Sequence, residues 1–280
     1  MRFIDIDKLE SLGAERPGPW RVGSDQLLRT TWSGQPFTSL EDAQKVFDRY
    51  HEAHVAGAGS PEPLEIVRVN SGYGVLVEWV EGVGLGAHIL LGSYSAAEAG
   101  EAIGQYARSL HLLQTTKGEN WQRNFHTYAQ TLAPHLPNKT AKRLVQLVDV
   151  IPESHCFLHG DLHVANMVVV KGTLAPIDME MMGFGHPVFD LAISRSRLFH
   201  SALAKDILGY TEDDYQKSAD TLWKAQLEAY FEGREIDLDA VNTGIQVLAA
   251  LEYAANYDDM LEDGAAFIAE LLPYVDRLDV

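Results

Sequence analysis

Three side chains that carry oxygen donors stand close together near the middle of the chain. Residues 159–166 read H-G-D-x-x-x-x-N, which supplies Asp161 and Asn166, and Asp178 follows a short stretch later. Phosphoryl transfer from a metal-bound nucleotide needs such a set: one carboxylate orients the attacking hydroxyl and accepts its proton, while an amide oxygen and a second carboxylate hold magnesium. The order and types of these residues therefore indicate phosphoryl-transfer chemistry.

A predicted β-hairpin separates the asparagine from the last aspartate. Residues 167–171 and 174–177 are apolar runs, and the pair Gly172-Thr173 between them predicts a turn. Because a hairpin returns the chain to its starting point, we expect Asn166 and Asp178 to lie side by side. Two such oxygen ligands, completed by phosphate oxygens and water, make an ordinary magnesium site.

The wider motif resembles a known family. Protein kinases have the same Asp-to-Asn spacing and a metal-binding Asp after the next strand. Here, however, Gly160 stands where protein kinases have Arg, His163 lies inside the loop, and G-H-P-V-F-D-L-A follows at residues 185–192. These features resemble the aminoglycoside phosphotransferase and choline kinase-like family. The match is specific over residues 156–195 and looser over most of the chain.

The resemblance implies a role for each of these residues. Asp161 is then the catalytic base, Asn166 and Asp178 are the ligands of Mg2+, and Asp190 braces the catalytic loop from the next helix. ATP is the expected phosphoryl donor.

The resemblance also implies the fold. We expect an α+β, bilobal protein-kinase-like fold, with a small β-rich N-terminal lobe over residues 1–81 that covers the nucleotide. A large, mainly helical C-terminal lobe over residues 82–280 would carry the catalytic loop and the substrate site.

Two other interpretations of the motif remain open. His159 and His163 have the spacing of a zinc site on one helix face, but no Glu lies between them, and Gly160 and Asp161 disfavour a helix. The aspartates could also be ordinary turn carboxylates, as many Asp residues near Gly are. His159 is expected to hydrogen-bond within the loop.

The N-terminal part reads as a strand at 26–32, a helix at 39–56 capped by Ser39, and a hairpin of strands at 63–69 and 73–80. A kinase strand carries a Lys that pairs with a helix Glu and binds phosphate. The candidate cation here is Arg29, although an Arg in a strand can equally be a plain surface cation. No glycine-rich phosphate loop is evident.

Two further assignments in this part depend on the kinase-like interpretation. Asp48 is the first choice for the acid that pairs with the cation, and Glu52 is the next. By resemblance, the exit of the last strand presents backbone N–H and C=O groups to the adenine edge, from Glu78, Trp79 and Val80.

Helical periodicity dominates the rest of the chain. His111 is expected to be structural, and the acidic and aromatic residues Glu252, Tyr253, Tyr257, Asp258 and Asp259 are interpreted either as an amphipathic helix or as a site for an ammonium group. The predicted helices cover residues 96–113, 125–136, 139–150, a segment from 187, 211–231, 237–261 and 265–278.

Composition limits the classes of partner. The net charge is −18, of which −13 falls on residues 200–280, and this acidity argues against nucleic-acid binding. It is compatible with a cationic substrate or simply with an acid-rich surface. The single cysteine, Cys156, excludes an internal disulfide, and no apolar run approaches the ~18 residues of a membrane span. We expect a cytoplasmic protein without a membrane or nucleic-acid partner, whose oligomeric state the sequence leaves open.

The expected function is transfer of the γ-phosphoryl group of ATP to a hydroxyl of a small molecule, such as an aminoglycoside, a choline-like alcohol or a metabolite. One alternative is a protein Ser/Thr kinase of the same superfamily, against which Gly160 and the lack of an A-P-E segment count. The other is a non-catalytic nucleotide-binding regulatory module.

Overall fold

The structure is a computed structural model that describes residues 1–12, 18–31, 33–200, 212–256 and 261–275. The chain forms two compact units. The first contains Met1–Gly82 and Val168–Glu180, and the second contains Val83–Met167 and Met181–Val280. The segment Val168–Glu180 thus groups with the N-terminal residues, whereas the sequence division at 81/82 places it with the C-terminal part.

The first unit contains a five-stranded sheet with the strand order β1-β4-β5-β3-β2. β1 pairs with β4 in parallel, and the remaining neighbours are antiparallel. The strands are β1 (Phe3–Ile4), β2 (Trp20–Val22), β3 (Gln26–Arg29), β4 (Pro63–Val69) and β5 (Gly72–Glu78). The predicted hairpin is therefore present as β4 and β5, and β3 ends three residues before the predicted strand does.

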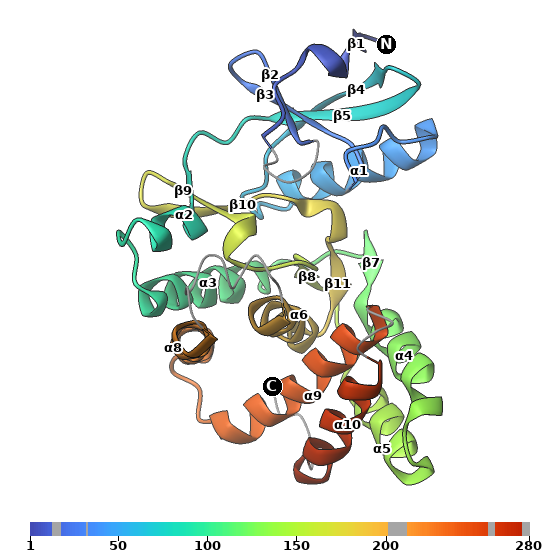
Figure 1. Ribbon diagram of the computed structural model, residues 1–280, viewed down its shortest axis with the longest axis vertical. Helices are drawn as coiled ribbons and strands as arrows, with labels where there is room; N and C mark the ends of the chain where they lie inside the picture. Colours follow the sequence, from blue (N-terminus) through green and yellow to red (C-terminus); the bar gives the residue numbers. More distant parts are fainter. Residues whose placement is uncertain (13–17, 32, 201–211, 257–260, 276–280) are drawn as a thin grey trace. The chain divides into compact units, whose positions relative to one another are not determined.

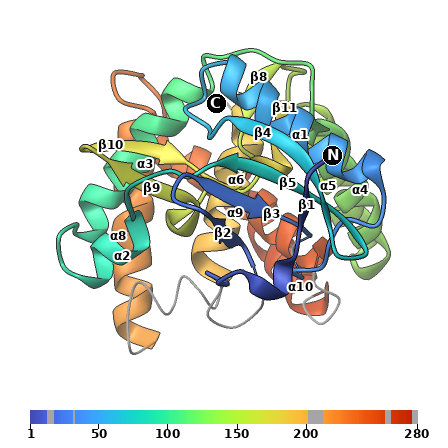
Figure 2. The ribbon, with the colours of Figure 1, turned by 90° about the horizontal axis from the view of Figure 1, so that it is seen from above.

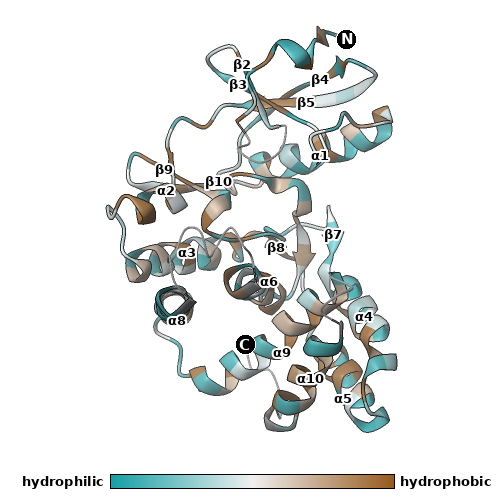
Figure 3. Ribbon diagram, viewed as in Figure 1, coloured by the Kyte–Doolittle hydropathy of each residue, from teal (hydrophilic) through white to brown (hydrophobic). Residues whose placement is uncertain are grey.

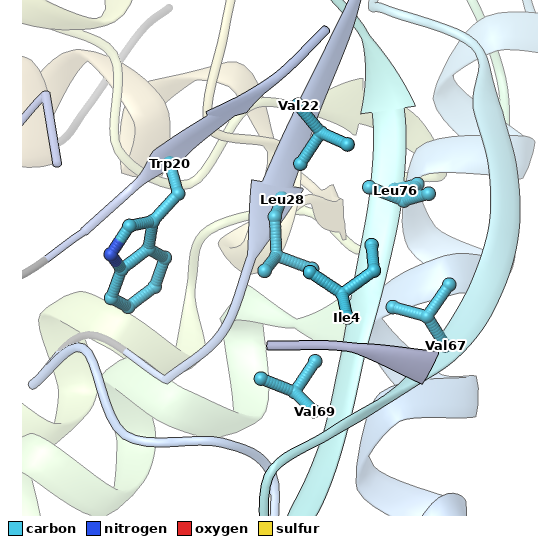
Figure 4. Packing of buried hydrophobic residues seen from close by; sticks show 7 residues of the cluster. All are labelled: Ile4, Trp20, Val22, Leu28, Val67, Val69 and Leu76. Carbon is cyan, nitrogen blue, oxygen red and sulfur yellow. The ribbon is translucent and has the colours of Figure 1, made fainter. Parts of the chain in front are cut away.

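Apolar side chains from all five strands form a core on this sheet (Figure 4). It comprises Ile4, Trp20, Val22, Leu28, Val67, Val69 and Leu76. Val75 and Val77 in β5 have the opposite parity to Leu76 and are also buried, so β5 is covered on both faces. Helix α1 (Leu40–Val55) packs against β4 and β5 (Figures 1 and 2). Its N-cap is Ser39, whose hydroxyl accepts a hydrogen bond from the backbone N–H of Asp42, as predicted.

A second hairpin consists of β9 (Met167–Val170) and β10 (Thr173–Pro176). Lys171 and Gly172 between them both have positive φ, which is the conformation of the tight turns that suit the twist of a hairpin. The hairpin is therefore where the sequence predicts it, but its turn is Lys171-Gly172 rather than Gly172-Thr173.

The second unit is mainly helical. A small sheet has β11 (Gly183–Gly185) between β7 (Glu119–Asn120) and β8 (Cys156–Leu158), and β6 (Val83–Gly84) precedes the first helix. The described helices are α2 (Leu85–Leu90), α3 (Ala96–Leu110), α4 (Trp121–Leu132), α5 (Asn138–Asp149), α6 (Pro187–His200), α8 (Glu212–Tyr230), α9 (Leu238–Asn256) and α10 (Leu261–Leu271).

Most of these helices agree with the hydrophobic periodicity. The amphipathic pattern of α5 is visible along its ribbon (Figure 3), and its apolar residues Leu144, Leu147 and Val148 are buried. α4 begins four residues before the predicted start because the Asn120 side chain caps it. α10 begins at Leu261, four residues before the predicted start at 265. The predicted cap at Thr211 and the predicted end at Leu278 lie outside the described residues. In the described parts of the chain, no helix is long and apolar enough to span a membrane.

Two glycines allow α3 and α8 to pack closely. A Cβ added at Gly100 would lie 2.1 Å from the carbonyl oxygen of Leu222, and one at Gly104 would lie 2.3 Å from that of Gln226. Both distances are far shorter than any real contact, so the absence of a side chain sets the separation of these helices.

We therefore expect Gly104→Ala to destabilise the protein, although alanine is the better helix former by about 1 kcal/mol. The new methyl group would push α8 away, and overpacking of this kind costs roughly 1–3 kcal/mol. Urea denaturation of the variant measures the loss. Gln105→Ala, on the exposed face of the same helix, is the matched control. A Gly104→Ala protein as stable as the control would contradict the packing argument.

Candidate active site

The H-G-D-x-x-x-x-N loop runs from the end of β8 to the start of β9, and a buried carboxylate holds its first turn. The two oxygens of Asp190, on α6, accept hydrogen bonds of 2.9 Å from the backbone N–H groups of His159 and Gly160. Asp190 has no exposed surface. Its expected role as the brace of the loop is confirmed.

Two side chains from other helices complete the environment of this carboxylate. Nε2 of His111, at the end of α3, lies 3.1 Å from Asp190, and Nδ1 lies 2.9 Å from the hydroxyl of Tyr230 on α8. A proton on Nε2 lets the ring donate to Asp190, while Nδ1 faces the hydroxyl of Tyr230. Burial alone would raise the pKa of Asp190, but hydrogen bonds and charge from His111 and His159 outweigh burial and lower it. His111 is therefore structural, as expected.

Gly160 has a backbone conformation that no other residue could adopt here. Its φ is +79°, and an added Cβ would lie 2.0 Å from the carbonyl oxygen of Met181 and 2.7 Å from the ring of Trp121. Left-handed backbone is natural for glycine and costly for residues with a Cβ. This explains in physical terms why Gly160 replaces the Arg of the protein-kinase motif.

Both carboxylate oxygens of Asp161 are held by neighbouring donors. Nε of Arg197, on α6, donates to Oδ1 at 2.8 Å, and Nδ2 of Asn166 donates to Oδ2 at 3.0 Å. Nε2 of His163 lies 3.5 Å from Oδ2. Burial raises the pKa of Asp161, but His163 and Arg197 outweigh that effect and hold the pKa well below its ordinary value. The group is therefore an ionised, fixed carboxylate at neutral pH.

Asn166 is oriented by the same contacts. Its Nδ2 donates to the backbone oxygen of Asp161 at 2.9 Å as well as to the carboxylate. Both partners are acceptors, so the NH2 group must face them, and the amide oxygen Oδ1 is left for another ligand. An oxygen donor held in this way suits a hard cation such as magnesium.

The loop histidines are engaged within the loop. Nδ1 of His159 accepts from the backbone N–H of Asp161, and Nδ1 of His163 accepts from that of Ala165, both at 3.3 Å. The structural role expected for His159 is thereby confirmed. Within the described ranges, no group of three or more His, Cys, Asp or Glu side chains is arranged to hold a metal ion. The structure thus offers no support for the zinc alternative.

In the first unit, Arg29 forms an ion-pair cluster with two acids. Its Nη2 lies 2.7 Å from both Asp178 Oδ1 and Glu180 Oε1, and its Nε donates to Glu180 at 3.0 Å. The cation was expected to pair first with Asp48 and next with Glu52. Asp178 and Glu180 take that role instead, and Asp48 accepts a hydrogen bond from the side chain of Gln44 on α1.

Asp178 also has an unusual backbone. Its φ is +63°, in the left-handed region that residues with a Cβ seldom adopt. Such conformations are concentrated at functional sites, where surrounding contacts compensate for their cost. The pKa of the neighbouring Glu180 is raised. Burial and the negative charge of Asp178 raise it, and the positive charge of Arg29 offsets only part of this effect. The observation marks residues 178–180 as a candidate functional segment.

At the exit of β5, fewer backbone groups are available to contact adenine than expected from the sequence. The N–H of Glu78 donates to the carbonyl of Glu62, and that of Trp79 donates to the carbonyl of Asp25, each at 2.8 Å. The ring of Trp79 lies under the guanidinium of Arg21, 4.6 Å from its centre. The N–H groups of Glu78 and Trp79 are thus committed within the unit, and any N–H contact to adenine from this segment falls to Val80.

The predicted site residues divide between the two units. Asp161 and Asn166 belong to the second unit and interact directly, whereas Asp178, Arg29 and Glu78–Val80 belong to the first. The expectation that Asn166 and Asp178 lie side by side stays a prediction.

Sequence reasoning assigned no role to two residues of these clusters, Glu180 and Arg197. Arg197 follows Asp190 by seven positions on α6, a spacing that places both on one helix face. For Arg197 the sequence signal was that spacing, and for Glu180 it was the position of a second carboxylate two residues after Asp178.

The acidic and aromatic cluster near the end of α9 is only partly within the described residues. Glu252 is 2% exposed and pairs with Arg197, so it is not an open site for an ammonium group. Tyr253 is half-buried, and Tyr257, Asp258 and Asp259 lie outside the described residues.

Comparison with protein families identifies the class. The model of the phosphotransferase enzyme family matches residues 20–227, which is most of the chain. The chain belongs to this phosphotransferase family. No curated protein sequence matches it.

Solved structures confirm the fold at low sequence identity. A choline/ethanolamine kinase family protein from Mesorhizobium loti is 16% identical with a TM-score of 0.59, over 95% of this chain and 92% of that one. A thermostable mutant of aminoglycoside phosphotransferase APH(4)-Ia, in apo form, is 18% identical with a TM-score of 0.58, over 96% and 93%. Amicoumacin kinase, in complex with AMP-PNP and Ca2+, is 14% identical with a TM-score of 0.55, over 96% and 92%. The predicted α+β, bilobal protein-kinase-like fold is confirmed.

Proposed function

We propose that this protein transfers the γ-phosphoryl group of ATP to a hydroxyl group of a small molecule. The observation that carries the proposal is the fixed pair of Asp161 and Asn166: the amide NH2 is bonded to Asp161, so the carboxylate is oriented and the amide oxygen is left for a cation. Membership of the phosphotransferase family supports the reaction type.

In this mechanism, Asp161 acts on the acceptor hydroxyl. Its ionised carboxylate accepts the hydroxyl hydrogen bond and aims the oxygen at the γ-phosphorus. As the new P–O bond forms, the bond from that phosphorus to the bridging oxygen of ADP breaks, ADP leaves, and the carboxylate takes the hydroxyl proton. Because contacts with His163 and Arg197 lower its pKa, the carboxylate is a weak base. Its main contribution is therefore orientation, with proton acceptance late in the transfer.

The available donors fit magnesium. Asn166 and Asp178 would hold the ion, and the bound ion would neutralise charge that develops on the phosphates. Arg29 would contribute a cation for the phosphates, since guanidinium groups bind them in a bidentate manner. The backbone N–H groups of Glu78 and Trp79 already have hydrogen-bond partners. The expected contact between adenine and the backbone of residues 78–80 is therefore proposed for Val80.

A small molecule is the proposed class of acceptor. The structurally similar proteins include kinases of choline or ethanolamine, of aminoglycosides and of amicoumacin. The net charge of −18 favours a cationic member of this class over an anionic one. The cytoplasm is the proposed compartment, because ATP is available there and the single free cysteine suits reducing conditions.

Incubation with ATP labelled at the γ-phosphate tests the proposal. The acceptors should be aminoglycosides, choline-like amino alcohols and a Ser/Thr peptide in separate reactions with Mg2+. We expect label on at least one small molecule and none on the peptide. Transfer to the peptide alone would overturn the proposal in favour of a protein kinase. Binding of ATP without any transfer would favour a regulatory module.

Asp178→Ala should remove the magnesium dependence of nucleotide binding. Without this carboxylate, one oxygen ligand of the proposed ion is lost, while groups that contact the nucleotide directly remain. Isothermal titration with ATP, with and without Mg2+, measures the effect. Asp48→Ala is a matched control, since Asp48 is an exposed carboxylate of the same unit. A full Mg2+ effect in Asp178→Ala would rule out this residue as a ligand.

A further inference from the structure

Helices α6 and α9 place an ion-paired arginine against the candidate base. We propose that Arg197, anchored by the buried carboxylate of Glu252, is a positioning residue that fixes the orientation of Asp161. The inference rests on the proposed function for its catalytic meaning. The ion pair and its effect on Asp161 can be measured independently of turnover.

Arg197 joins two carboxylates with different nitrogens. Its Nε donates to Asp161 Oδ1 at 2.8 Å, and its Nη1 donates to Glu252 Oε2 at 3.1 Å. Hydrogen bonds between charged groups are the strong ones, and the planar guanidinium fixes the direction of each N–H. The distance and angle of the contact to Asp161 are therefore set by where Glu252 holds the other side of the group.

Glu252 is well suited to act as that anchor. Its side chain is 3% exposed and accepts hydrogen bonds from the hydroxyl of Ser196 and from Nδ2 of Asn256, in addition to Arg197. A carboxylate buried to this degree is retained when its charge is paired and its lone pairs are occupied. Because these three donors lie on two helices, the Glu252 carboxylate is held in place, and it holds the Arg197 guanidinium in place in turn.

The contact also completes the restraint of Asp161. Asn166 holds Oδ2 from within the loop, and Arg197 holds Oδ1 from α6. With donors on both oxygens, the carboxylate plane is held against rotation, and the remaining lone pairs point in fixed directions. A hydroxyl bound to them is held in one orientation, which is the role that positioning groups have in lowering the barrier.

Removing Arg197 would leave one oxygen of Asp161 without its donor. His163 and Asn166 contact Oδ2 from the same loop, while Oδ1 has its donor from α6. Without Arg197 the remaining contacts lie on one oxygen only, so the carboxylate could rotate about them.

The direct experiment observes the Asp161 carboxyl carbon by NMR at neutral pH in protein labelled with 13C at the aspartate carboxyl groups. Asp161→Asn identifies the resonance. We expect Arg197→Gln to move the chemical shift of this resonance, because the carboxylate loses the donor on Oδ1. Arg197→Lys, which keeps a charged donor, should restore most of the change.

Arg195→Gln is the matched control. Arg195 lies on the same helix and is half-buried, but its guanidinium packs over the rings of Phe199 and Trp223. It should leave the Asp161 carboxyl resonance unchanged. An unchanged Asp161 resonance in an Arg197→Gln protein that circular dichroism shows to be folded would overturn the inference. An equal shift in Arg195→Gln would also overturn it, because the effect would then not come from a specific contact.

The kinetic arm uses release of inorganic phosphate from MgATP, with water as the acceptor. Arg197→Gln should lower kcat about tenfold and leave KM for ATP nearly unchanged, since the residue acts on the base and not on the nucleotide. A rise in KM with kcat unchanged would contradict the positioning role. Failure of the wild-type protein to bind or turn over ATP would instead overturn the proposed function and leave the NMR result interpretable.

Discussion

Asp161→Asn is expected to reduce phosphoryl transfer about 10³-fold, within the range that general-base groups contribute. The amide has the size of the carboxylate but cannot accept the proton. It also meets two N–H donors, from Arg197 and Asn166, and can accept from only one of them through its single oxygen. The orientation of the side chain is therefore lost together with its basicity.

The initial rate with an acceptor that the wild-type protein phosphorylates measures this effect. Titration with MgATP should show nucleotide affinity close to that of the wild type, because Asp161 is not assigned to the nucleotide or to the metal. Asp149→Asn, an exposed position at the end of α5, controls for the loss of one negative charge in the same unit. A rate near the wild-type rate in Asp161→Asn would end the assignment of Asp161 as the base.

Asp190→Ala is expected to lower the free energy of unfolding by about 3–5 kcal/mol, the cost of breaking a buried charged network by removing one partner. The backbone N–H groups of His159 and Gly160 would lose their acceptor, and Nε2 of His111 would lose its partner, all without access to water. Urea denaturation measures the loss. Asp190→Asn should be intermediate, because its one oxygen can serve only part of the network.

This stabilisation should depend on pH in a definite direction. The pKa of Asp190 is lower in the folded protein than its ordinary value, so the folded state binds fewer protons at this site than the unfolded state does. The contribution is complete above the ordinary pKa of about 4 and is lost as the pH falls through the lower folded value. The stability difference between wild type and Asp190→Ala should therefore shrink with acidification. A constant difference down to the acid transition would contradict this role of the Asp190 charge.

Individual helices and hairpins could be predicted from the sequence because their signals are local, whereas the overall fold followed from the family resemblance. Ser39 and Ser95 mark helix starts through side-chain bonds to residues three positions away, and both caps are present. The β9–β10 hairpin is predicted from two apolar runs with a glycine between them. Asp190 was expected as the brace by resemblance, and the structure bears this out.

The contacts that set the properties of the candidate site were harder to predict from the sequence. Arg197 and Glu252 are 55 residues apart, and Arg29 and Glu180 are 151 apart. No periodicity relates such positions, and a charged residue in a helix is usually a solvated one. The helix acid expected to pair with Arg29 was chosen by analogy with kinases. Arg29 instead pairs with Asp178 and Glu180, in the segment after β10. Tertiary packing alone decides between these partners.

The backbone at Gly160 also has an evolutionary consequence. A single base change can turn a glycine codon into one for arginine, yet the carbonyl of Met181 occupies the space that the first carbon of any side chain would need. In this chain, that single change would therefore clash with the main chain at Met181, and an arginine could be accommodated only if the backbone around it also moved. Position 160 is thus expected to resist substitution as long as the loop keeps its present conformation.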